Sequence, residues 1–154
     1  MDKAFLLRQW TNIRQSFYQS LEKIPLELSY YSWRPSPDSR SLAELIYHLG
    51  SAEEGWLSIA TLKEPLWQDL PDGITPQGIK DYLISLHDKT LAFFEDLSDE
   101  EIQKKVFFTS SSGSTEECTL SWILWHLVEH EIHTRAQLFV YMRSLKLIPP
   151  RYSG

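Results

Sequence analysis

Apolar residues recur every three or four positions along most of this chain, which is the period of an α-helix that buries one face. The first such stretch covers residues 3–24 and carries apolar side chains at Leu6, Trp10, Ile13, Phe17, Leu21 and Ile24. A second begins at Ser41, because Ser41 and Glu44 have the types and the spacing of a capping box, and continues to about residue 62. Both stretches predict long amphipathic helices.

Two further long helices are predicted in the second half of the chain. Thr75 and Pro76 are the residue types preferred at an N-cap and a first helical position, so a third helix begins there and ends near residue 97. The last helix covers roughly residues 120–145, and the segment IPPRYSG stops it. Four long helices with crossover connections predict an all-α fold, a four-helix bundle that forms one domain over residues 1–154.

A shorter insertion separates the third and last helices. Ser98 and Glu101 form a second possible capping box, which predicts a short helical turn. The segment KKVFFTSSSGSTEECTL follows, with a Ser/Gly centre between β-branched and aromatic flanks. This pattern indicates an irregular loop or a short hairpin before the last helix.

Composition and charge exclude several classes of protein. The net charge is −6 and no run of Lys or Arg interrupts it, so we expect no nucleic-acid partner. No stretch approaches 18 consecutive apolar residues, and the N-terminus MDKAFLLRQW lacks the features of a signal peptide, so we expect no membrane association. The single cysteine, Cys118, cannot form an internal disulfide, which suits a reducing cytoplasm.

Carboxylate pairs offer little specific chemistry in this sequence. We expect them to lie on solvated helix faces, and they are Glu53–Glu54, Glu116–Glu117 and Glu129/Glu131. A ferritin-type di-iron site needs Glu-x-x-His on two helices, and that spacing is absent. His87 is interpreted as a solvated or hydrogen-bonded histidine.

The remaining histidines are the candidate chemistry. The segment WHLVEHEIHTRAQL contains His126, His130 and His133, and ELIYHLGSAEEGW contains His48. On helical wheels His48 and His130 flank the apolar stripes of their helices, whereas Thr134 lies inside the stripe. Shoulder positions on two facing helices are where a bundle builds a site, and neutral imidazole binds zinc, nickel, iron or copper in preference to magnesium.

Two segments, RSLAELIYHLGSAEEGWL and WHLVEHEIHTRAQL, resemble the DinB-like (YfiT/DinB) superfamily of four-helix-bundle metalloproteins, and the resemblance covers nearly the whole chain. It implies a divalent metal, often zinc or nickel, held by one histidine of the second helix and an i, i+4 pair of the last helix. His48 and His130 match two of these ligands. Thr134 stands at the third ligand position, and His133 precedes it.

This departure from the family pattern changes the predicted metal site. A threonine hydroxyl is a poor zinc ligand, and two histidines with water bind a metal weakly. His126 lies one turn before His130 and offers an alternative i, i+4 pair, while His133 offers an i, i+3 pair. The predicted ligands are His48, His130 and His126, with zinc or nickel weakly bound or absent.

The resemblance implies a metal-dependent enzyme that acts on a small molecule, either a thiol transferase or a hydrolase. The alternative is a metal-poor or metal-free bundle that serves as a binding or dimerisation module. Thr134 favours the alternative, and the presence of both His48 and His130 argues against it. A homodimer is compatible with either function, and the substrate is not specified by the sequence.

Overall fold

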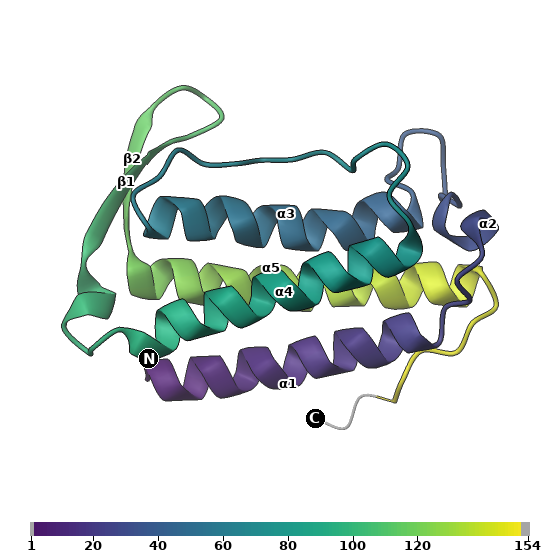
Figure 1. The fold of residues 1–154 in the computed structure, drawn as a ribbon, viewed down its shortest axis with the longest axis horizontal. Helices are drawn as coiled ribbons and strands as arrows, with labels where there is room; N and C mark the ends of the chain where they lie inside the picture. Colours follow the sequence, from purple (N-terminus) through teal and green to yellow (C-terminus); the bar gives the residue numbers. More distant parts are fainter. Residues whose placement is uncertain (1, 152–154) are drawn as a thin grey trace.

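Four long helices lie side by side and form a four-helix bundle in the computed structural model, which describes residues 2–151 (Figure 1). The long helices are α1 (Lys3–Glu22), α3 (Leu42–Ala60), α4 (Pro76–Asp96) and α5 (Leu120–Ser144). Shorter elements lie between them: α2 (Leu28–Tyr31), the 3-10 helix η1 (Glu101–Gln103), and strands β1 (Lys105–Thr109) and β2 (Thr115–Thr119). The predicted fold class is therefore confirmed, with α2 as an additional short helix that apolar periodicity did not indicate.

The helices do not simply alternate in direction. In Figure 1, α1 and α5 run one way and α3 and α4 run the other way, and residues 61–75 return along the length of α3 before α4 begins. This long connection is one of the predicted crossovers. It brings a loop across the face of α3, where it contributes to the candidate site described below.

Side-chain caps mark the start of the long helices, as at α3, α4 and α5. Ser41 Oγ accepts a hydrogen bond from the Glu44 backbone N–H at 3.2 Å, and the Ser41 backbone N–H donates to Glu44 Oε2 at 2.5 Å, which completes the predicted capping box. Thr75 Oγ1 accepts from the Gly78 N–H at 3.0 Å, and Thr119 Oγ1 accepts from the Trp122 N–H at 3.1 Å. Each cap satisfies a backbone donor that has no partner within its own helix.

The insertion before α5 is a β-hairpin. Strands β1 and β2 pair antiparallel with Val106 opposite Cys118, and Gly113 in the connecting turn has φ +84°. A glycine is suited to this position because left-handed backbone strains other residues. Val106 and Ile102 are buried in the core, so the hairpin base packs against the bundle.

The bundle core depends on close helix approach at Gly50. A Cβ atom added at Gly50 would lie 2.5 Å from the Tyr82 ring and 2.8 Å from a Leu83 methyl group, so α3 and α4 pack closely because this position has no side chain. Within residues 2–151, no helix combines the length and the apolar character needed to cross a membrane.

Candidate metal centre

His48 of α3 and His130 of α5 come together at the interface of the two helices. Their ring centroids are 5.2 Å apart and the ring planes are inclined by 64°. Two imidazoles that share one tetrahedral zinc ion, each with a nitrogen 2.0–2.1 Å from it, have ring centroids about 5 Å apart. The separation of this pair therefore fits two ligands of a single ion.

Both rings are neutral at pH 7, which is the form of histidine that binds metals. Burial, with smaller contributions from the neighbouring His48 and His126 rings, lowers the pKa of His130 to about 4. Burial also lowers the pKa of His48, with a smaller contribution from the positive charge of Arg40. Two nitrogen lone pairs are thus free of competing protons across the neutral range.

His126, the third predicted ligand, lies in an aromatic environment. Its ring stacks on Trp122, with centroids 4.9 Å apart and planes only 6° from parallel, and the edge of Trp56 lies 4.9 Å away on a second side. The His126 and His130 centroids are 6.4 Å apart, which is longer than the separation of the His48–His130 pair. His126 is therefore near the pair, and aromatic packing defines its present orientation.

Thr134 points inward, as the helical wheel predicts, and is 1% exposed. Its hydroxyl donates a hydrogen bond to the His130 backbone carbonyl at 2.9 Å, so it is engaged within its own helix. His133 lies on the exposed face of α5. Within residues 2–151, no three His, Cys, Asp or Glu side chains are already positioned to hold one ion.

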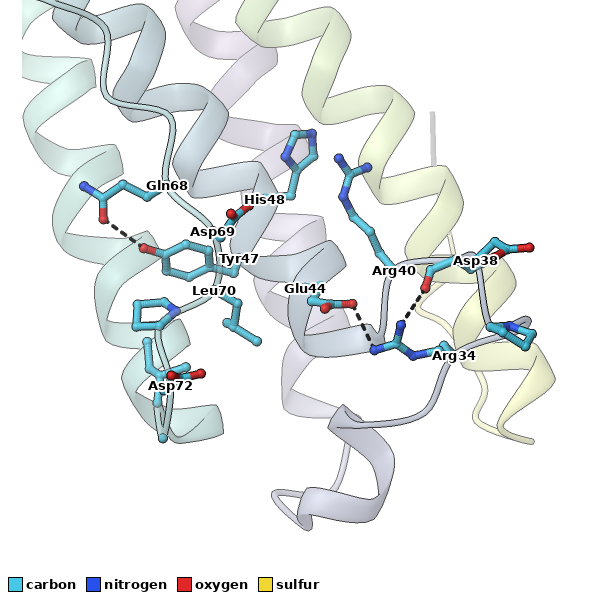
Figure 2. Close-up of a pocket in the computed structure, with 15 residues that line it drawn as sticks. Arg34, Asp38, Arg40, Glu44, Tyr47, His48, Gln68, Asp69, Leu70 and Asp72 are labelled. Atoms are coloured by element: carbon cyan, nitrogen blue, oxygen red, sulfur yellow. Dashed lines mark hydrogen bonds and ion pairs between the residues drawn. The ribbon is translucent and has the colours of Figure 1, made fainter.

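A cavity of about 390 Å³ opens beside the histidine pair. Besides His48, His126 and His130, its walls include Arg40, Trp56, Trp67 and Asp69. A larger pocket of about 720 Å³ adjoins it and shares His48, Arg40 and Asp69, and in Figure 2 Asp69 and Arg40 lie on either side of His48. The smaller cavity combines apolar surface with a few polar groups, as small-molecule sites do, whereas the larger pocket is lined mainly by polar and charged side chains.

The outer wall of the cavity is the 61–75 connection, and several contacts hold it against α3. Ser51 Oγ donates to the Gln68 carbonyl at 2.7 Å and accepts from the Gln68 N–H at 2.8 Å. The Trp67 indole lies directly over Gly55, where an added Cβ would be 2.1 Å from the ring. Trp67 also meets Trp56 edge to face, with centroids 5.9 Å apart. The loop therefore has a defined position over the site.

A buried ionic cluster lies in the bundle interior, and one of its members, Glu131, directly follows His130. Arg14 of α1 reaches Glu131 of α5, with Nε 2.5 Å from Oε1, and Glu53 of α3, with Nη2 2.7 Å from Oε2. Trp10 Nε1 donates to Glu131 at 2.6 Å, and His87 Nδ1 of α4 lies 3.4 Å from Glu53. All four long helices thus contribute to one polar network.

Interactions within the cluster keep Glu53 and Arg14 ionised despite their burial. Burial alone would raise the pKa of Glu53, but the Arg14 guanidinium and the His87 ring hold it below its usual value. Burial alone would lower the pKa of Arg14, and the two carboxylates raise it well above the ordinary range. Glu53 and Arg14 are therefore both charged at neutral pH.

The expectation that Glu53 and Glu131 lie on solvated faces was wrong. Both are at most 1% exposed, because Arg14 compensates their charges inside the core. His87 is hydrogen-bonded but buried rather than solvated. One sequence signal was available: Arg14 lies four residues after Trp10 and three before Phe17, in the apolar stripe of the first helix.

The fold is similar to those of solved DinB-like proteins and of YfiT. The crystal structure of a DinB-like protein from Bacillus cereus ATCC 10987 matches with a TM-score of 0.78 at 23% identity, over 96% of this chain and 95% of that one. YfiT from Bacillus subtilis, described as a probable metal-dependent hydrolase with an unusual four-helix bundle topology, matches with a TM-score of 0.73 at 18% identity, over 94% of this chain and 87% of its own.

Sequence comparison agrees with the structural matches. The uncharacterized protein YjoA of Bacillus subtilis is 29% identical over 122 residues, which are 75% of this chain and 74% of YjoA. The sequence model of the DinB family matches residues 1–152, almost the entire chain. The protein therefore belongs to the DinB family.

Proposed function

We propose that this protein is a metal-dependent enzyme that acts on a small molecule, with hydrolysis as the leading reaction class. The observation that carries the proposal is the His48–His130 pair, two neutral imidazoles with centroids 5.2 Å apart in the wall of a cavity. The description of the similar protein YfiT as a probable metal-dependent hydrolase supports the same reaction class.

In this proposal His48 and His130 bind a divalent transition metal such as zinc or nickel, and His126 is the third histidine within reach of the same cavity. When bound there, such an ion lowers the pKa of a water or thiol and so supplies a nucleophile at neutral pH. A thiol transferase would use the same pair, with a thiol in place of water.

The other walls of the cavity have roles that follow from their chemistry. Trp56 and Trp67 line the cavity with aromatic rings, which favour an apolar or planar part of a substrate. Arg40 supplies a positive charge beside the histidine pair and suits an anionic group on the substrate.

A second candidate function is a metal-poor bundle that binds a small molecule or a second copy of itself. The observation in its favour is Thr134, whose hydroxyl is engaged with the His130 carbonyl where related proteins would offer an imidazole. In this case the cavity would serve binding without catalysis.

Metal content and activity of protein purified without a histidine tag discriminate these functions. We expect stoichiometric zinc or nickel after loading, and metal-dependent hydrolysis of activated esters or amides that a chelator abolishes. His48→Ala should remove both properties, whereas His133→Ala, an exposed histidine of the same helix as His130, should leave them unchanged. Equal metal content in wild type and His48→Ala would refute the enzyme proposal and favour the binding module.

A further inference from the structure

We infer that Asp69, on the connection between α3 and α4, supplies the third protein ligand of the metal site, in place of the missing histidine at position 134. This inference rests on the proposed function, because it requires that His48 and His130 bind a metal. It assigns a carboxylate of a loop to a site whose other ligands come from helices.

The helices around the pair have no available third ligand in their present arrangement. Thr134 donates its hydroxyl hydrogen to the His130 carbonyl, and the His126 ring is stacked on Trp122. Glu53 and Glu131 are both held by Arg14 in the core, and Glu44, one turn before His48, is engaged by the Ser41 backbone N–H and Arg34. This arrangement favours a third ligand from outside α3 and α5.

Asp69 is the acidic residue among those that line the cavity with His48 and His130. Its carboxylate makes no hydrogen bond or ion pair with any part of the chain between residues 2 and 151, so it is available to an ion. Figure 2 shows its side chain close to His48. The preceding residue, Gln68, is held at both backbone groups by Ser51, so the backbone before Asp69 has a defined position beside this cavity.

Charge balance provides an independent reason. Arg40 already places a positive charge next to two neutral imidazoles, and a divalent ion adds two more charges of the same sign. Asp69 offsets part of this charge at the point where the ion would bind. Two histidines, one carboxylate and an open position also form an established ligand set for catalytic zinc and for iron(II).

Zinc affinity, measured by competition with a chromophoric chelator on tag-free protein, tests the assignment. Asp69→Asn removes the charge while retaining the shape. We expect zinc affinity to fall at least about tenfold, because changing a residue that only hydrogen-bonds to a metal ligand already costs about that much. Asp72→Asn is the matched control, because Asp72 and Asp69 are both exposed on the same loop, and Asp72 lines the adjoining larger pocket but not this cavity. An exposed charge that does not contact the ion is screened by salt, so the control should retain wild-type affinity.

A spectroscopic readout separates a ligand from a nearby charge. The visible absorption of the cobalt(II)-loaded protein reports the ligand set directly, and it should change in Asp69→Asn and remain unchanged in Asp72→Asn. If the two variants behave alike while His48→Ala loses zinc, the inference is wrong and the proposed function stands. An equal loss in His126→Ala and His48→Ala, without one in Asp69→Asn, would identify His126 as the third ligand. If wild type binds zinc no better than His48→Ala, both the inference and the proposed function fail.

Discussion

Replacing Arg14 with methionine removes the positive charge that two buried carboxylates share. Arg14, Glu53 and Glu131 are each at most 1% exposed, so water cannot replace the lost guanidinium. Breaking a buried ion pair in this way costs about 3–5 kcal/mol, because an uncompensated charge remains in the core. Since a domain of this size has a free energy of unfolding of roughly 5–15 kcal/mol, Arg14→Met should lose a large part of it.

Urea denaturation followed by circular dichroism at pH 7 measures this loss. The control is Lys105→Met, which breaks the exposed Lys105–Glu117 pair at 2.6 Å on the hairpin and should cost at most about 1 kcal/mol. A triple variant, Arg14→Met with Glu53→Gln and Glu131→Gln, removes all three charges and should recover part of the stability. An Arg14→Met protein no less stable than Lys105→Met would refute the reasoning.

The pH dependence gives the same prediction a second readout. In the wild type, folding lowers the pKa of Glu53. Its ionised carboxylate therefore adds to the free energy of unfolding above the ordinary carboxyl pKa, and this contribution is lost as pH falls through the pKa of Glu53 in the folded state. In Arg14→Met the desolvated carboxylates gain raised pKa values, and the folded state then takes up protons. The variant should therefore become more stable as pH falls from 7 to 5, whereas the wild type should not.

Three further predictions concern local contacts. Gly55→Ala places a Cβ against the Trp67 ring, which is 55% exposed and can move outward, so we expect increased quenching of tryptophan fluorescence by acrylamide with little loss of unfolding free energy; unchanged quenching would contradict the contact. Ser41→Ala removes the cap of α3 and should cost about 1 kcal/mol in urea denaturation, and a cost near zero would contradict the capping argument. Thr134→His adds an imidazole one turn from His130 that can fill the open position of the proposed site, and it should raise zinc affinity in calorimetric titration; no gain would contradict a ligand position at residue 134.

Spacing alone does not decide which residue is the third ligand, because packing from other helices orients the candidate rings. His126 and His130 are four residues apart, which places them on one helix face and makes them a plausible ligand pair. The orientation of the His126 ring depends on Trp56 of another helix as well as on Trp122 of its own. The sequence does not indicate a role for Asp69, because a lone aspartate in a proline-containing loop has no periodic pattern that relates it to either histidine.

Helix positions were determined by the sequence alone, because apolar periodicity and capping boxes are local properties: Ser41 and Thr75 cap helices in the structure as their neighbours predict. The inward position of Thr134 and the shoulder position of His130 also follow from helical geometry within one segment. Only the tertiary structure decided that Arg14 compensates Glu53 and Glu131, which lie 39 and 117 positions away. A charged side chain has the same local sequence pattern whether it faces water or a partner distant in the sequence. The packing of α1 against α3 and α5 determines that Arg14 faces the two carboxylates.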